Sequence, residues 1–153
     1  EKLLYVLTND MLSSASVPPY NSSIGSHIRH ILDFYDCILE GIDSKEIDLT
    51  NRKRDERMHS DCDYTLGHVE RIIDLLKKLD GIDFTQNYIV SDDLGMGKVD
   101  ITYTLGAILA QANSHAIHHY AIINYILDRL GISMNDDTFG YNPTTPTTEI
   151  NLN

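Results

Sequence analysis

The stretch YTLGAILAQANSHAIHHYAIINYILDRL, residues 103–130, is the longest helical pattern in the chain and decides the expected fold. Its apolar side chains recur every three or four positions, as in an amphipathic α-helix, and Gly131 directly after it is a typical helix end. A second stretch, SSIGSHIRHILDFYDCILEG at residues 22–41, has the same period, opens with serines suited to an N-cap and closes on Gly41. We therefore expect two long amphipathic helices.

Two further helices and one extended segment complete the expected fold. Apolar residues at helical spacing predict helices over residues 1–15 and about 62–80, whereas residues 84–102 alternate roughly with period two. Four amphipathic helices in a chain of this length indicate an all-α four-helix bundle, with a small extended or hairpin excursion between helices three and four. Residues 1–153 are then a single domain with an extended tail at 139–153.

Composition argues against two classes of partner. The chain has 153 residues, with 12 Lys and Arg against 23 Asp and Glu, a net charge of −11 and a pI of about 4.8. Such a balance disfavours binding to nucleic acid or to an anionic membrane surface, and no apolar run reaches the roughly 18 residues of a membrane span. The cysteines, Cys37 and Cys62, make no disulfide framework and favour a reducing, cytoplasmic setting.

Histidines are concentrated on the two long helical patterns. His115 and His119 lie one turn apart, roughly 40° from each other around the axis, within the apolar stripe of residues 103–130. Two imidazoles in that arrangement, facing a bundle interior, are well placed to hold a divalent metal. A third nitrogen ligand would come from the other long helix, which supplies His27 and His30, and periodicity alone favours His27.

The same pattern has a structural interpretation. Core histidines are commonly held by a carbonyl or a tyrosine, and a lone HxxxH pair fits that interpretation as well as it fits a metal site. A second helix that carries histidines favours the metal. A zincin-type protease is excluded because HExxH is absent, with Ala116 and Ile117 where its glutamate would stand. A ferritin-like di-iron site is disfavoured because only Glu56-Arg57-Met58-His59 matches its ExxH motif.

The segments GSHIRHILDFYDCIL (25–39) and SHAIHHYAIINYIL (114–127) resemble the DinB/YfiT-like superfamily of small metal-binding four-helix bundles. The resemblance covers most of the chain and is most specific in these two segments. It implies that one histidine on the second helix and an HxxxH pair on the last bind a divalent metal, usually zinc or nickel in character. The implied ligands are His30, His115 and His119, with His30 chosen because HILD (30–33) matches the family's H-(L/I)-x-D stretch.

Other polar residues near these ligands have two interpretations each. His27 becomes a pocket residue or a hydrogen-bond partner of a ligand. Asp33 is either a solvated helix carboxylate or a partner that fixes an imidazole, and His118 is a hydrogen-bonded residue at the helix edge or a proton shuttle. Arg52 and Arg54 either solvate a loop or bind an anionic substrate.

The expected function follows from the resemblance. Three neutral imidazoles leave at least one coordination position open, which suits hydrolysis or activation of a thiol. Because relatives include thiol-dependent S-transferases and hydrolases, we expect a metal-dependent enzyme acting on a small molecule, with a low-molecular-weight thiol somewhat favoured. The alternative is a non-catalytic bundle that is metal-stabilised or binds a small ligand. A homodimer is the further partner that the resemblance implies.

Overall fold

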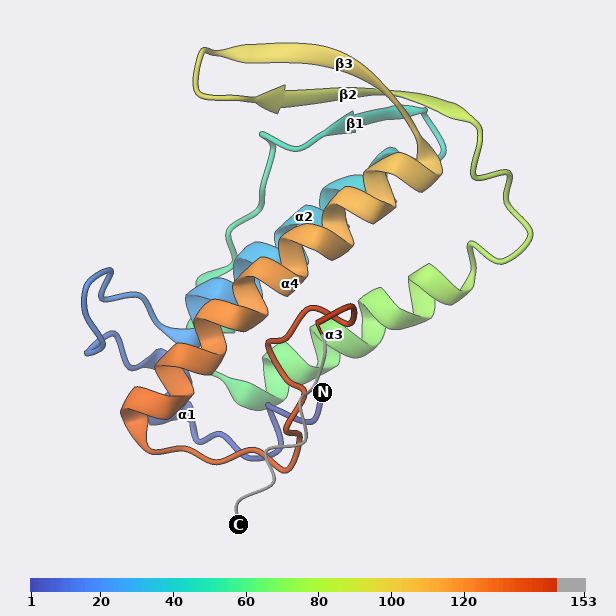
Figure 1. The fold of residues 1–153 in the computed structure, drawn as a ribbon. Helices are drawn as coiled ribbons and strands as arrows, with labels where there is room; N and C mark the ends of the chain where they lie inside the picture. The colour runs from blue at the N-terminus through green and yellow to red at the C-terminus, as the bar shows by residue number, and fades with distance from the viewer. Residues whose placement is uncertain (146–153) are drawn as a thin grey trace.

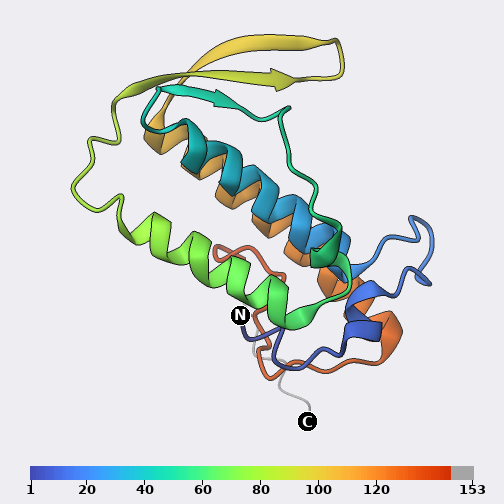
Figure 2. The ribbon, with the colours of Figure 1, turned by 180° about the vertical axis from the view of Figure 1, so that it is seen from behind.

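The computed structural model describes residues 1–145. Two long helices, α2 (Ile24–Gly41) and α4 (Leu105–Leu130), lie side by side, and α3 (Cys62–Lys77) packs along α2 (Figures 1 and 2). A sheet covers the end where α2 finishes and α4 begins, and a short α1 (Asn9–Ser13) lies near the opposite end (Figure 1). None of the helices in the described part of the chain has the length and hydropathy needed to cross a bilayer.

Short polar side chains set the ends of the long helices. The Ser23 hydroxyl accepts the Ser26 N–H at the start of α2, and the Thr104 hydroxyl accepts the Ala107 N–H at the start of α4. Such caps satisfy backbone donors that have no partner within the helix. Gly131 ends α4 in the left-handed conformation, with φ of 67°, which a glycine adopts at little cost.

The core consists of two separate hydrophobic clusters along the α2/α4 pair. One cluster joins the first half of α2 and the end of α4 to α1 and α3, and includes Ile24, Leu32 and Ile123. The other joins the second half of α2 and the start of α4 to the sheet, and includes Ile38 and Ile108. The middle of each long helix, between the two clusters, is where the polar residues of the candidate site lie.

The prediction of an all-α four-helix bundle is wrong, because the chain folds as a mixed α/β structure with a three-stranded sheet. The strands β1 (Glu46–Asp48), β2 (Asn87–Asp93) and β3 (Lys98–Thr104) lie in that order, with β1 parallel and β3 antiparallel to β2. The hairpin β2–β3 occupies the predicted excursion, but β1 falls in a charged connection. Ile47 pairs with Val90 and is 1% exposed, so burial of one apolar side chain fixes a strand too short to show a period.

The predicted first helix is also much shorter than residues 1–15. Leu3, Leu4 and Leu7 are buried as their spacing suggests, yet the helix itself starts only after Thr8, whose hydroxyl accepts the Met11 N–H. The chain therefore lacks a fourth helix of bundle length within its described residues. Of the predicted extended tail, residues 139–145 form turns and bends, and residues 146–153 lie outside the described residues.

Candidate metal centre

Three histidines from α2 and α4 lie close together between the two hydrophobic clusters. His30 comes from α2, and His115 and His119 come from successive turns of α4, so that each can offer a ring nitrogen within 4.8 Å of the others. Their ring centroids are 4.6 to 4.8 Å apart. Residues four apart share a face of a helix, which is why the HxxxH pair points as a unit toward α2.

The donor set fits a divalent ion. His30 Nε2 lies 2.9 Å from His115 Nε2, which is a hydrogen-bond distance between one protonated and one bare nitrogen. Tetrahedral zinc at about 2.0–2.1 Å from each nitrogen would hold its ligands about 3.3 Å apart, so small ring rotations suffice. The cluster can therefore hold a metal ion.

Electrostatics keep these imidazoles neutral. Burial, followed by the charge of Arg52 and the neighbouring imidazoles, lowers the pKa of His30 from 6.5 to about 4. Burial and then His115 and His30 lower the pKa of His119 to about 3. Burial likewise lowers the pKa of His115, which Asp92 on β2 partly opposes. Neutral imidazoles are the protonation state that metal coordination requires.

His27 lies behind the cluster rather than in it. Its Nδ1 is 2.9 Å from Nδ1 of His119, and its Nε2 is 2.8 Å from the Ser22 hydroxyl. Since the His119 Nδ1 is engaged, Nε2 is the nitrogen of His119 left for an ion. Metal-bound histidines commonly donate their second N–H to such a partner, which fixes the ring and its tautomer.

Phe34 packs against the cluster and Gln111 lies one helical turn from it, and the sequence analysis missed both. The Phe34 ring stacks on His115 with 5.1 Å between centroids. Gln111 lies one turn before His115 on α4, and its buried Oε1 finds no hydrogen-bond donor in residues 1–145. The i, i+4 spacing of Gln111 and His115 was visible in the sequence.

Asp33 differs from both of its predicted interpretations. It is 2% exposed, so it is not solvated, and its Oδ1 accepts the backbone N–H of Arg54 at 3.3 Å. Within residues 1–145 it makes no hydrogen bond to an imidazole. Burial raises the pKa of Asp33, and Arg29 opposes that rise. Asp33 therefore holds the loop after β1 against α2.

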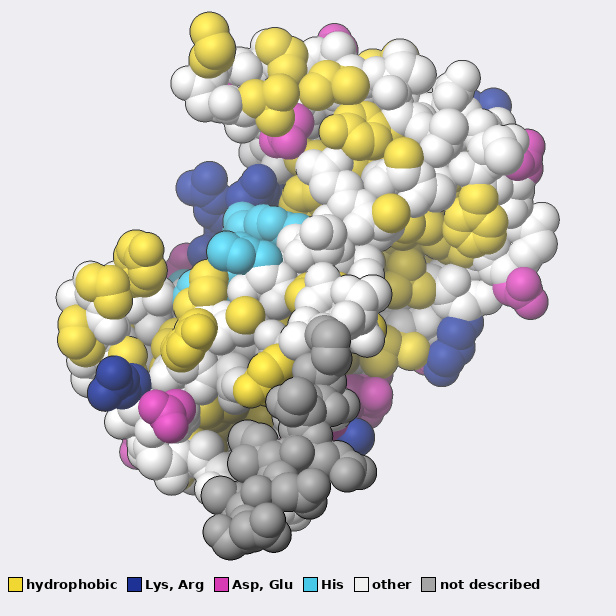
Figure 3. All heavy atoms as spheres, in the orientation of Figure 1, with side chains coloured by type: hydrophobic (Ala, Val, Ile, Leu, Met, Phe, Trp, Pro, Cys, Tyr) yellow, Lys and Arg dark blue, Asp and Glu magenta, His cyan; other side chains and the backbone are white. Residues whose placement is uncertain are grey.

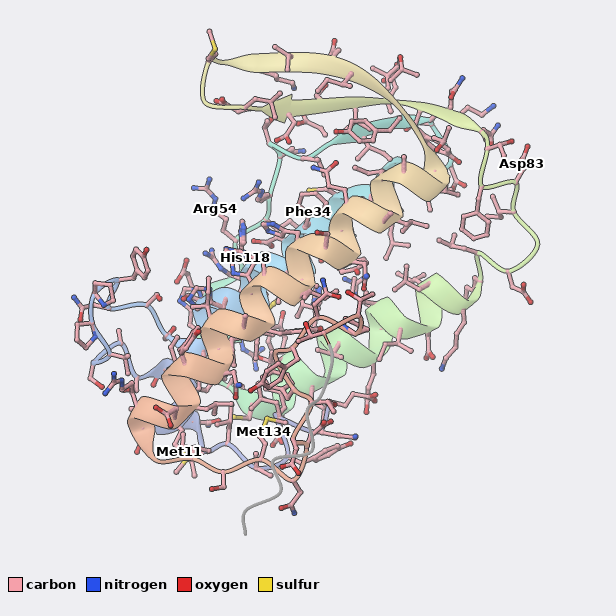
Figure 4. All side chains as sticks on the ribbon, viewed as in Figure 1. Met11, Phe34, Arg54, Asp83, His118 and Met134 are labelled. Atoms are coloured by element: carbon pink, nitrogen blue, oxygen red, sulfur yellow. The ribbon has the colours of Figure 1, made fainter. Side chains whose placement is uncertain are left out.

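His118 is exposed on α4, with its ring centroid 5.2 Å from that of His119. Its imidazole makes no hydrogen bond to any residue from 1 to 145, so the predicted bond to a neighbour at the helix edge is not seen. Figure 3 shows histidine side chains at the surface in a recess below the hairpin, next to basic side chains, and Figure 4 labels His118 and Arg54 on this side of the molecule. The cluster is thus open to a ligand from solvent.

Two other features lie away from this cluster. Asp36, buried on α2, pairs with His68 at 2.7 Å and with Arg71, which ties α2 to α3. A mostly apolar groove of about 410 Å³ runs between α2, α3 and the segment after α4, and its lining includes Ile28, Tyr35 and none of the seven histidines.

No protein-family model, curated protein or solved structure matches the chain. The family resemblance and the roles of individual residues therefore remain predictions, whereas the proximity of the three histidines is a property of the structure.

Proposed function

We propose that this chain is a divalent-metal-dependent enzyme of the DinB/YfiT-like kind that acts on a small molecule, by thiol S-transfer or by hydrolysis. The single observation behind this proposal is the cluster of His30, His115 and His119, three neutral imidazoles of which His30 and His115 are partly exposed and His119 is buried. Zinc or nickel suits such nitrogen ligands. A bound ion of this kind supplies Lewis-acid chemistry to an oxygen or sulfur group of the substrate.

The remaining residues hold and shape the site in this proposal. His27 Nδ1 accepts a hydrogen bond from the Nδ1–H of His119, and its Nε2–H donates one to the Ser22 hydroxyl, which fixes the tautomers of both rings. Phe34 supports the His115 ring from the side of the core. His118, exposed beside His119, is the residue that this proposal assigns to proton transfer between the site and solvent.

Elemental analysis of the purified, untagged chain tests the metal. We expect about one equivalent of a transition metal in the wild type and none in the His115→Ala, His119→Ala double variant. A His118→Ala variant is the matched control, since it removes an exposed histidine of the same helix and should keep the metal. A wild-type chain that is empty and takes up neither zinc nor nickel would refute the site.

Measurement of substrate turnover tests whether the chain is a metal-dependent enzyme. Thiol-transfer and hydrolytic substrates are screened with the loaded chain, and we expect any activity to disappear with a chelator and return with zinc or nickel. Activity that survives complete metal removal would show that the three histidines are not its source.

The second candidate function is a non-catalytic module that binds a small apolar ligand, and the groove favours it. The groove has about 410 Å³, is lined mainly by apolar side chains such as Leu32 and Ile72, and lies apart from the histidines. Pockets of this size and character suit small ligands. Binding of an environment-sensitive fluorescent probe that is blocked by Ile28→Trp, with unchanged metal content, would support this candidate.

A further inference from the structure

The loop after β1 carries three consecutive basic residues, and two of them have no acidic partner within residues 1–145. Lys53 pairs with Glu40, whereas no carboxylate of residues 1–145 lies within 4.0 Å of a guanidinium nitrogen of Arg52 or Arg54. The chain has almost twice as many acidic as basic residues, so acidic groups are not scarce. Among residues 1–145 these two guanidinium groups have no carboxylate partner, so they are available to an anion from solution.

Arg52 is in direct contact with the cluster. Its Nη1 donates to Nδ1 of His30 at 3.2 Å, and its Nε donates to the Leu49 carbonyl at 2.9 Å. A guanidinium has donors only, so His30 Nδ1 must be bare and the proton of the neutral ring must lie on Nε2. That proton then points to Nε2 of His115, 2.9 Å away.

This arrangement makes Arg52 a competitor of a metal for His30. If His30 binds an ion through Nδ1, Arg52 must leave that nitrogen. If it binds through Nε2, the proton moves to Nδ1, where it would face the donors of Arg52. With either nitrogen as the ligand, the contact between Arg52 and His30 must break.

An oxyanion is the group best suited to draw Arg52 away. Carboxylate and phosphate oxygens accept two parallel hydrogen bonds from a guanidinium, which is a stronger interaction than one bond to a neutral imidazole. Arg54, two residues further along the loop, supplies a second guanidinium on the side of the molecule where Figure 4 also labels His118, and its backbone N–H is held by Asp33. Because the guanidinium is a rigid plane, Nη1 leaves His30 only if the whole group turns, and the Nε bond of Arg52 to the Leu49 carbonyl shifts with it.

We propose that Arg52 and Arg54 form an oxyanion-binding subsite for a carboxylate or phosphate group of the substrate, and that its occupation releases His30 to the metal. Metal and oxyanion then bind cooperatively, and by linkage each raises the affinity of the other by the same factor. The metal half of this proposal rests on the proposed function, whereas the subsite itself does not.

Zinc affinity, measured by competition with a chromophoric chelator, tests the coupling. The full chain is titrated in chloride, then with acetate or with methylphosphonate, which separates carboxylate from phosphate recognition. We expect one of these anions to raise the zinc affinity of the wild type about fivefold or more. Arg52→Ala should bind zinc more tightly than the wild type without anion and lose the anion effect. Arg54→Ala should weaken only the anion effect, because it keeps the contact between Arg52 and His30.

Arg129→Ala is the matched control. Arg129 is exposed, has no carboxylate partner in residues 1–145, and lies ten residues beyond His119 on α4, about 15 Å along the axis. It should behave as the wild type, which separates the contact with His30 from a general loss of positive charge. Equal zinc affinity and equal anion response in Arg52→Ala and the wild type would overturn the proposal.

A chain that binds no zinc at all would refute the proposed function without deciding the subsite. The metal-free chain decides the subsite by thermal unfolding in acetate and in methylphosphonate. A rise in Tm with one of these anions in the wild type but not in Arg52→Ala supports the subsite, and the same response in both chains refutes it.

Discussion

Acidification of the metal-free chain should destabilise the fold through the imidazoles of His30 and His119. Burial is the main cause that lowers the pKa of His30 from 6.5 to about 4 and that of His119 to about 3. Unfolded histidines titrate near 6.5, so between about pH 6.5 and pH 3 the unfolded chain binds more protons than the folded one. The contribution of the two neutral rings to stability is therefore complete above pH 6.5 and is lost as the pH falls.

The size of this effect follows from the shifts. At about pH 5, His119 is still neutral in the folded chain. This pH is about 1.5 units below the pKa of His119 in the unfolded chain, so the free energy of unfolding falls by about 2 kcal/mol. His30 is more exposed than His119, and solvent screening makes its share smaller. Urea unfolding with a chelator present, followed by circular dichroism at about pH 7.5 and about pH 5, measures the loss. His119→Gln should lose about 2 kcal/mol less than the wild type over this range.

The control for this prediction is His118→Gln, which changes an exposed imidazole of the same helix and should keep most of the wild-type pH dependence, because burial contributes more than the charge of His118 to the lowered pKa of His119. An equal loss in the wild type and in His119→Gln would refute the argument, because the burial of His119 could then not be the source of the acid sensitivity.

Four more substitutions test the fold and the site. Ile47→Ala should cost about 2–5 kcal/mol in the free energy of unfolding, since it empties a fully buried position on β1, and a change below 1 kcal/mol in urea unfolding would contradict the role given to this strand. Gly25→Ala should destabilise α2 by about 1–3 kcal/mol because its Cβ would lie 2.7 Å from the His59 backbone. In Gly67→Ala the added Cβ has no neighbouring atom within 4 Å, so this variant should stabilise α3 by up to about 1 kcal/mol. Thermal unfolding should therefore show a lower Tm for Gly25→Ala and a higher Tm for Gly67→Ala than for the wild type. His27→Ala should weaken zinc binding about 10–100-fold through loss of the partner of His119, and unchanged affinity in chelator competition would remove that partner role.

The two long helices could be predicted from the sequence because many residues repeat the same period. The predicted ranges 22–41 and 103–130 differ from α2 and α4 by two residues at each N-terminus, and the caps Ser23 and Thr104 are visible in the sequence. Strand β1 could not be predicted in this way. Three residues carry no measurable period, and Ile47 is a strand residue only because β2 and α2 bury it.

In the site too, the features set by local helix geometry could be predicted from the sequence, and those set by tertiary packing could not. Helical period alone places His115 and His119 on one face, because the spacing within a helix is fixed by local geometry. Period does not choose between His27 and His30, since that choice depends on how α2 is rotated against α4. The contact of Arg52 with His30 could not be foreseen, because it depends on the loop between β1 and the 3₁₀ helix Glu56–His59.

The position of the histidines between the two hydrophobic clusters bears on whether they are structural or functional. The lowered pKa of His30 and of His119 shows that the interior disfavours their charged forms, and three polar rings replace apolar contacts that α2 and α4 make above and below them. A helix pair selected for stability alone would continue the apolar stripe, as Ile28 and Ile38 on α2 do. Departures from the expected apolar pattern of a helix are concentrated at functional sites. The break in the core is therefore an argument for a ligand at this position that is independent of family resemblance.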